Sequence, residues 1–202
     1  MPSTRVSNRL ILASSSRYRH ELLSRLKLPF DVAVPDIDES ALPRETPEQT
    51  AVRLAVAKAR AVADREGKAL IIGSDQVATL DGAQIGKPGT HDKALAQLQR
   101  MRGRSVIFHT ALCVVDNREE KMSVQVENVQ TTVVFRVLPD HELDAYLRQE
   151  KPYDCAGSAK NEGLGIAIIE RIESTDPTAL TGLPLIALTT MLRQAGVSFF
   201  AG

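Results

Sequence analysis

Hydrophobic residues occur along this chain in short continuous runs that alternate with segments of helical periodicity. The run Leu10–Leu12 ends in three serines, and leucines then recur at helical spacing over residues 18–26. Residues 29–34 predict a second strand, so the chain opens as strand, helix, strand. Strands and helices that alternate in this way are typical of α/β domains.

The next predicted element is a long helix. Thr46 is a suitable N-cap, Pro47 fits the first helical position, and Gln49 stands three residues after the cap. The pattern predicts a helix from Thr46 to about Arg65, ended by Gly67.

A central strand is predicted at residues 69–75, where continuous apolar residues end in small and acidic ones. This prediction places Asp75 at the carboxyl end of the strand, where sheets of this type bind ligands. Residues 77–80 and 83–86 flank Asp81-Gly82, a dipeptide that fits a type I′ turn, so a hairpin is expected next.

The rest of the chain continues the mixed pattern. Thr90 is expected to cap a helix that Gly103 ends, and two β-rich stretches at 105–115 and 124–137 are expected to pair as an antiparallel hairpin. Further helices are expected from Pro139 and at 183–194. The elements predict a mixed α/β fold, with a sheet flanked by helices.

Composition limits the domain count and the partners. A chain of 202 residues predicts a single domain over 9–202, preceded by a frayed polar tail at 1–8 without the apolar core of a signal peptide or anchor. Lysine plus arginine and aspartate plus glutamate both number 25, so neither nucleic acid nor membrane is an expected partner. Cys113 and Cys155 lack metal-ligand spacing and predict reduced thiols in a cytoplasmic protein.

The three serines at 14–16 predict an anion site. Unpaired N–H groups and the positive end of the helix dipole favour negative charge there, and Arg19 adds a cation; a plain helix cap is the alternative. Acids and cations also fall in other predicted loops and on the long helix. Such a set is typical of a phosphoanhydride site, where carboxylates hold Mg²⁺ or Mn²⁺ and cations neutralise phosphate charge.

At these residues the chain resembles the Maf family of nucleoside triphosphate pyrophosphatases. The resemblance rests on seven segments in family order, which are Ala13–Arg19, Asp38-Glu39, Leu54–Ala59, Gly73–Val77, Gly86–Pro88, Cys155–Ser158 and Gly182–Leu185. It implies hydrolysis of a nucleoside triphosphate to the monophosphate and pyrophosphate with the help of a divalent metal. It also implies an elongated twisted sheet with a deep central cleft, of the Maf and ITPase type, and a homodimer.

Two positions are similar to the family branch that acts on 7-methyl-GTP. Gln76 follows Asp75, and Lys160–Gly163 reads Lys-x-Glu-Gly, whereas the branch acting on dTTP and UTP has Thr and Gln-Gly there. Glu162 could accept the guanine N1–H and N2–H groups and oppose the charge of the methylated ring. Tyr18, where the family often has tryptophan, would add a cation–π contact. A dTTP, UTP or other noncanonical nucleotide pyrophosphatase is the alternative.

Each candidate residue has a hypothesised role. Asp75 is either the general base or a metal ligand with Glu39, and both roles stay open. The expected phosphate-binding residues are Ser14, Ser16, Arg19, Lys58, Lys87 and Lys160. The residues expected to select the base are Tyr18, Gln76 and Glu162. A nucleotide-binding regulator of septum formation and cell division is the alternative from another class. The pair of carboxylates favours an enzyme, because a binder needs no group that activates water.

Overall fold

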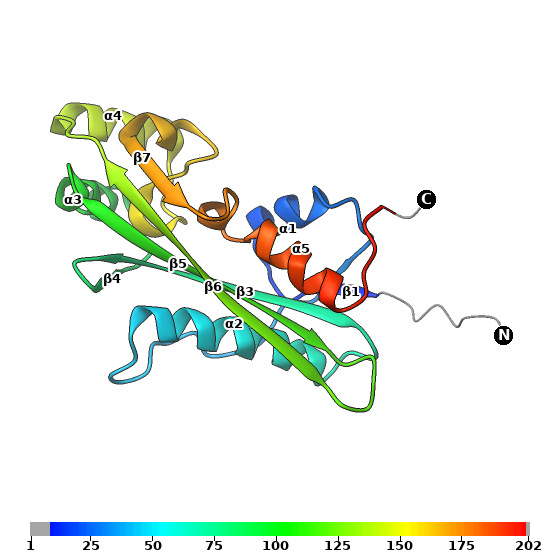
Figure 1. Cartoon of the computed structure of the whole chain (residues 1–202). Helices are drawn as coiled ribbons and strands as arrows, with labels where there is room; N and C mark the ends of the chain where they lie inside the picture. Colours follow the sequence, from blue (N-terminus) through cyan, green and yellow to red (C-terminus); the bar gives the residue numbers. More distant parts are fainter. Residues whose placement is uncertain (1–8, 201–202) are drawn as a thin grey trace.

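The computed structural model describes residues 9–200, so the tail expected at residues 1–8 lies outside it. Seven strands form one sheet in the order β2-β1-β3-β5-β6-β7, with β4 paired to β3 (Figure 1). They are β1 (Leu10–Leu12), β2 (Asp31–Val32), β3 (Leu70–Leu80), β4 (Ala83–Ile85), β5 (Ser105–Asp116), β6 (Ser123–Phe135) and β7 (Ile169–Ser174). Strand β1 is parallel to β2 and β3 and every other pair is antiparallel, so the predicted mixed sheet is confirmed.

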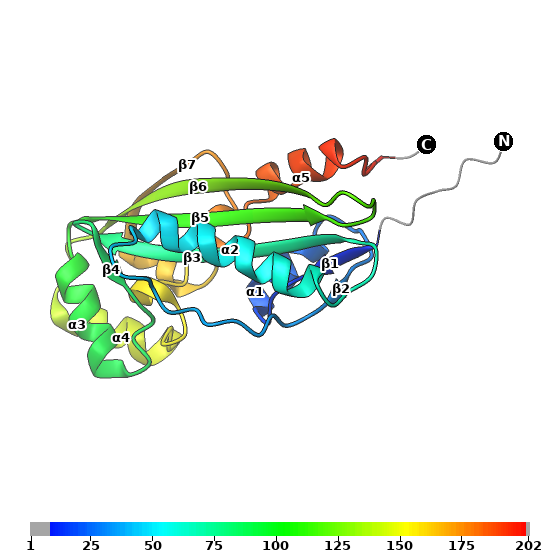
Figure 2. The same ribbon diagram turned by 90° about the horizontal axis from the view of Figure 1, so that it is seen from below.

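Five α-helices cover the two faces of the sheet. They are α1 (Arg17–Ser24), α2 (Pro47–Ala63), α3 (His91–Met101), α4 (Asp140–Glu150) and α5 (Leu185–Gln194). Helix α2 lies alone on one face, and the other four lie on the opposite face, with α3 and α4 at one end and α1 and α5 toward the other (Figures 1 and 2). Within residues 9–200, no helix combines the length and apolarity needed to cross a membrane.

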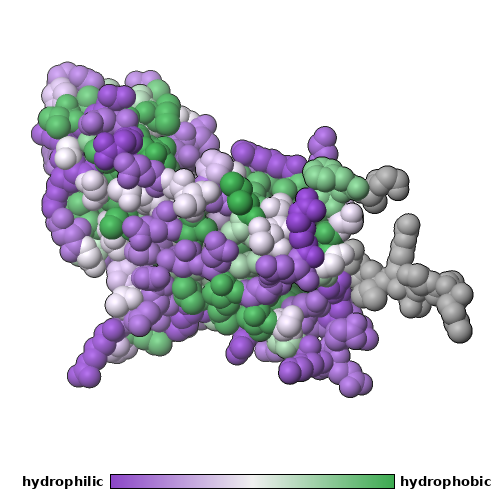
Figure 3. Space-filling view, in the orientation of Figure 1, coloured by the Kyte–Doolittle hydropathy of each residue, from purple (hydrophilic) through white to green (hydrophobic). Residues whose placement is uncertain are grey.

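Alternating side chains of the strands build three hydrophobic clusters. Leu10 and Leu12 of β1 pack with α1 and α5, whereas Ile11 points to the other face and packs with α2. At the far end of the sheet, Leu80 and Phe108 pack with α3 and α4. One face therefore carries two separate clusters. Hydrophilic residues dominate the outer surface seen in Figure 3, with hydrophobic ones distributed among them.

The N-terminus of α2 forms as its sequence predicts. Thr46 Oγ1 accepts a hydrogen bond from the Gln49 amide at 3.2 Å, and Gln49 Oε1 accepts one from the Thr46 amide at 2.9 Å. The helix ends at Ala63, two residues before the predicted end. The predicted turn is also confirmed, because Asp81 and Gly82 both have the positive φ, 52° and 78°, that a type I′ turn requires.

Strand β3 differs from its prediction. It is one strand of 11 residues, and Asp75 lies in its middle, opposite Ala111 of β5, rather than at a carboxyl end. Strand β1 pairs only with residues 70–72 of β3, and β4 only with residues 78–80. Among residues 9–200, no strand pairs with 73–77 along this edge. A gap in the sheet edge, rather than a strand end, therefore lies beside Asp75.

Strand β7 was not predicted from the sequence. It is an edge strand in which only Ile169 is buried and the following five residues are exposed. A strand with so little burial shows no clear alternation of apolar and polar residues in its sequence. Its pairing with β6 is therefore visible only in the structure.

Helix α2 crosses β3 at Gly73. A Cβ atom at Gly73 would lie 2.3 Å from the Ala55 carbonyl oxygen and 2.8 Å from the Ala59 amide nitrogen. Such distances are sterically forbidden, so the absence of a side chain permits the close approach of helix and strand. Lys58 lies on the same stretch of α2, and this contact therefore sets its distance from β3.

We expect Gly73→Ala to lower the free energy of unfolding by about 2–3 kcal/mol, because the methyl group must push α2 away from β3. Urea denaturation measures this change. Gly67→Ala is the matched control, since a Cβ there meets no atom within 4 Å, and it should cost less than about 1 kcal/mol. Equal stabilities for the two variants would contradict the proposed close contact.

Candidate active site

A cleft of about 600 Å³ lies beside the gap in the edge of β3. Its walls come from the start of α1, the loop before α2, α2 itself, β3, the loop after β4, and residues 154–162 and 180–182. The predicted site residues that line it are Ser14, Ser16, Tyr18, Arg19, Glu39, Lys58, Asp75, Gln76, Lys87 and Glu162. Segments far apart in the chain thus meet in one cavity.

The ammonium group of Lys58 joins the two predicted carboxylates. Its Nζ lies 2.6 Å from Asp75 Oδ1 and 3.0 Å from Glu39 Oε1. The Lys58 side chain is only 6% exposed, because α2 directs it toward the sheet. A buried ammonium group needs opposite charge nearby, and here it has two partners. Glu39 and Asp75 therefore converge on one point in the cleft.

Burial shifts the protonation of Asp75. It raises the pKa of this carboxyl group above its ordinary value, and the nearby Lys58 ammonium offsets part of that effect. The more distant guanidinium of Arg19 also lowers the pKa of Asp75, whereas the Glu39 carboxylate raises it. Asp75 is consequently a stronger proton acceptor than an exposed aspartate, as suits a general base.

The serine turn and Arg19 form a second part of the cleft. Ser16 caps α1 by accepting the Arg19 amide at 3.4 Å, and Ser14 Oγ accepts the Ser16 amide at 3.1 Å. The Arg19 side chain donates through Nε to the Gly182 carbonyl at 2.8 Å and through a terminal nitrogen to Ser14 Oγ at 3.4 Å. The buried Ser74 hydroxyl donates to the same carbonyl at 3.0 Å. The helix cap and the predicted anion site therefore share the same serines.

Sequence reasoning missed Gly182 and Ser74 as supports of Arg19. Gly182 belongs to a segment that carried the family resemblance, but it acts through its carbonyl oxygen, and a backbone group leaves no residue-type signal in a sequence. Ser74 sits within the predicted central strand, where its hydroxyl gives no indication of a partner 108 residues away.

Tyr18 and Cys155 form another part of the cleft wall. Its hydroxyl lies 3.9 Å from Cys155 Sγ and accepts a hydrogen bond from the Arg17 guanidinium at 2.8 Å. The same guanidinium lies 4.8 Å from the centre of the Tyr18 ring. Burial raises the pKa of Cys155 to about 11 and also raises the pKa of Tyr18, so both groups are neutral near pH 7. Cys155 also lines the cleft; it was predicted from the sequence as a free thiol at the start of a segment that carried the family resemblance.

The amide of Gln76 has a defined orientation. Its nitrogen donates to Thr110 Oγ1 at 2.9 Å and to the carbonyl oxygens of Ala179 and Leu180, both at 3.1 Å. Two carbonyl acceptors at one end identify that end as the nitrogen. The amide oxygen is therefore the atom that Gln76 can offer to a ligand in the cleft.

The donor set beside Lys58 fits a hard divalent cation shared with a substrate. Among residues 9–200, no group of three or more His, Cys, Asp or Glu side chains could enclose a metal ion. Mg²⁺ is commonly bound by one or two carboxylates, with phosphate oxygens and waters as its other ligands. The carboxylates of Glu39 and Asp75 match that pattern, because both face the same cleft.

A family model described as Maf-like protein matches residues 9–195. The chain belongs to the Maf-like family. Relatives match this chain in sequence over nearly its whole length. A protein of Burkholderia thailandensis named 7-methyl-GTP pyrophosphatase is 67% identical over 195 residues, which are 95% of this chain and 90% of the relative. A protein of the same name from Cupriavidus pinatubonensis is 65% identical over 193 residues, 96% of each chain.

A solved structure supports the fold of this Maf-like protein. The HAM1 protein from Coxiella burnetii superposes with a TM-score of 0.55 at 18% sequence identity, over 92% of this chain and 98% of that chain. The predicted architecture, an elongated twisted mixed sheet flanked by helices, is thereby confirmed.

Lys160 is the predicted phosphate ligand that the Maf-like cleft does not include. Its Nζ donates to Glu150 Oε1 at 2.7 Å, and that hydrogen bond raises the pKa of Lys160. The other oxygen of Glu150 accepts the Leu164 amide at 2.7 Å. Both contacts fasten the loop that carries Glu162 to the end of α4. Lys160 thus has an observed structural role, which depends on a partner that the local sequence pattern could not reveal.

Removal of the Lys58 charge should move the titration of Asp75 to higher pH. The ammonium lowers the pKa of Asp75, so Lys58→Met leaves only the more distant Arg19 to oppose the effect of burial, and the pKa should rise further. Carbon-13 NMR of the labelled aspartate carboxyl groups measures the midpoint, with Asp75→Asn to assign the signal. Lys87→Met, a cleft lysine without a contact to Asp75 in the described structure, should cause a smaller shift. A midpoint that falls or stays in Lys58→Met would refute the electrostatic assignment.

Proposed function

We propose that this Maf-like protein is a nucleoside triphosphate pyrophosphatase that hydrolyses 7-methyl-GTP to 7-methyl-GMP and pyrophosphate. The observation that carries the proposal is the meeting of Glu39 and Asp75 on the Lys58 ammonium, in a cleft that also holds the serine turn and Arg19. The names of relatives that are 65–67% identical support the choice of substrate. The proposed role is removal of modified nucleotides before they enter nucleic acid.

The chain's own residues supply binding and proton transfer in this proposal. Ser14, Ser16 and Arg19 bind phosphate oxygens at the start of α1, and Lys87 neutralises charge from the loop after β4. Asp75 accepts a proton from the attacking water, whose oxygen forms a bond to phosphorus as the anhydride bond to pyrophosphate breaks. The cations stabilise the negative charge that develops on the departing pyrophosphate.

We further propose that Glu39 and Asp75 hold a divalent cation, Mg²⁺ or Mn²⁺. When bound, such an ion polarises phosphate oxygens and stabilises their charge. Glu39 is the more accessible ligand, because its side chain is 59% exposed against 10% for Asp75. We assign the proton transfer to Asp75, since burial raises its pKa.

Selection of the base is assigned to Glu162, Gln76 and Tyr18. Glu162 accepts the guanine N1–H and N2–H groups and opposes the positive charge that N7-methylation places on the ring. The Gln76 amide oxygen offers a further acceptor, while Tyr18 contributes an aromatic face. All three line the cleft.

Three further expectations belong to this proposal. A cytoplasmic location follows from two free cysteines, Cys113 and Cys155, which reducing conditions would maintain. A homodimer follows from the family resemblance. Nucleic acid is not an expected partner, because the formal net charge is zero.

Asp75→Asn should lower kcat by about 10³-fold, because an amide cannot accept the water proton. Pyrophosphate release from 7-methyl-GTP with Mg²⁺ or Mn²⁺ is the assay, and KM should change far less than kcat. Asp92→Asn, an exposed position outside the cleft, is the control and should keep wild-type turnover. Full turnover by Asp75→Asn would exclude it as the base, and release of orthophosphate alone by the wild type would exclude the reaction.

Glu162→Gln should reduce the preference for 7-methyl-GTP over GTP by about tenfold, which corresponds to about 1.4 kcal/mol. The neutral amide no longer opposes the charge of the methylated purine, whereas the unmethylated ring loses less. The ratio of kcat/KM for the two nucleotides measures the effect. Glu170→Gln, an exposed carboxylate on β7 outside the cleft, should leave the ratio unchanged. An unaltered ratio in Glu162→Gln would refute its role in selection.

A further inference from the structure

The loop that carries Glu39 needs support from elsewhere in the fold. It connects β2 to α2 over residues 33–46 and contains no helix or strand. The Glu39 side chain is 59% exposed, and its ion pair with Lys58 joins it to the cleft. An ion pair whose carboxylate is largely exposed contributes little by itself. The position of Glu39 therefore depends on how the rest of the loop is attached.

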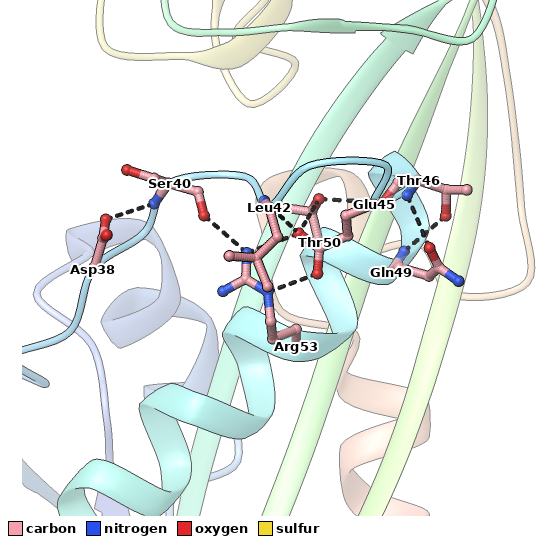
Figure 4. A network of polar contacts seen from close by, with 8 residues as sticks. All are labelled: Asp38, Ser40, Leu42, Glu45, Thr46, Gln49, Thr50 and Arg53. Carbon is pink, nitrogen blue, oxygen red and sulfur yellow. Dashed lines mark hydrogen bonds and ion pairs between the residues drawn. The ribbon is translucent and has the colours of Figure 1, made fainter.

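Arg53 of α2 attaches the loop beside Glu39 (Figure 4). Its NH2 group donates to the Ser40 carbonyl at 2.9 Å and to Glu45 Oε2 at 2.8 Å, and its Nε donates to Glu45 Oε1 at 2.6 Å. The guanidinium thus binds one carboxylate through two nitrogens and also the backbone of the residue that follows Glu39. A planar guanidinium can satisfy all three acceptors at once.

Glu45 accepts further hydrogen bonds from the loop and from α2. Its Oε2 accepts the Leu42 amide at 3.1 Å and the Thr50 hydroxyl at 2.9 Å, in addition to Arg53. The Glu45 side chain is only 9% exposed. The hydrogen bonds from Arg53 contribute most to lowering the pKa of Glu45, to about 2, so the carboxylate stays ionised at neutral pH. The charged contact between loop and helix is therefore present at neutral pH.

The same helix carries the partner of Glu39. Arg53 and Lys58 are both on α2, and Arg53 binds Ser40 while Lys58 binds Glu39. Two neighbouring residues of the loop are thus fastened to two points of one rigid helix. Neither Arg53 nor Glu45 lines the cleft, so neither is placed to touch a substrate.

We propose that Glu45 and Arg53 are positioning residues, which fasten residues 36–46 of this loop to α2 and so hold the Glu39 carboxylate beside Asp75. The catalytic consequence of this proposal rests on the proposed pyrophosphatase function. The attachment of the loop to α2 does not depend on that function.

Arg53→Lys tests the proposal, because it keeps the positive charge but cannot make the three hydrogen bonds of a guanidinium. Arg118→Lys is the matched control. Arg118 likewise binds one carboxylate, Asp116, through two nitrogens and donates to a carbonyl, that of Ala195, at 2.6 Å, but it lies away from the cleft. Hydrogen exchange over residues 36–46 should be at least about tenfold faster in Arg53→Lys and unchanged in Arg118→Lys.

A double-mutant cycle connects the loop to Glu39. Arg53→Lys should lower kcat/KM by about tenfold in the wild type and by less than about twofold in a Glu39→Gln background, because residue 39 then has no carboxylate to be positioned beside Asp75. Equal losses in the two backgrounds would show a general structural effect and overturn the proposal. Glu45→Gln is the second variant, and it should reproduce both results if Arg53→Lys does not fold.

Hydrogen exchange gives a reading that does not require activity. Arg53 donates to the Ser40 carbonyl and to both oxygens of Glu45, so unchanged exchange over residues 36–46 in Arg53→Lys would overturn the positioning role. If the wild type releases no pyrophosphate, the proposed function fails, while exchange still decides whether Arg53 fastens the loop.

Discussion

A buried ammonium between two carboxylates is the interaction on which the site depends. Lys58 belongs to α2, Asp75 to β3 and Glu39 to the loop between β2 and α2, so one charge cluster joins three elements. Lys58 and Asp75 would each be costly to bury alone, and each is tolerable because the other is present, whereas Glu39 is largely exposed. Burial also raises the pKa of Asp75 and makes its carboxylate more basic.

Two features of the sheet give the cluster its place. Gly73 lets α2 approach β3 closely enough for Lys58 to reach Asp75. On the edge of β3 away from β5, the short partners β1 and β4 leave residues 73–77 without a neighbouring strand among the described residues. A central strand that is packed against a helix on one face is thus open along part of its edge. The cleft lies there, between the two hydrophobic clusters of the opposite face.

The rest of the site consists of loops that are fastened to rigid elements. Arg53 ties the loop of Glu39 to α2, and Glu150 ties the loop of Glu162 to α4. The Gly182 carbonyl fixes the guanidinium of Arg19 at the start of α1. Loops supply chemically varied side chains, while helices and strands supply precision. In this Maf-like protein each of these loop contacts is a hydrogen bond that involves a charged side chain. Because hydrogen bonds are directional, they fix the position of a loop more closely than apolar packing does.

By itself the sequence determined the features that depend on a few neighbouring residues. The capping box at Thr46, the type I′ turn at Asp81 and the residue types of the cleft follow from local hydrogen bonding, backbone preference and motif chemistry. Only the tertiary structure decided that Asp75 lies inside a long strand and that Lys160 pairs with Glu150. Those outcomes depend on which distant segments become neighbours. An ion pair or a pairing between strands contributes energy only once the fold has brought its two partners together.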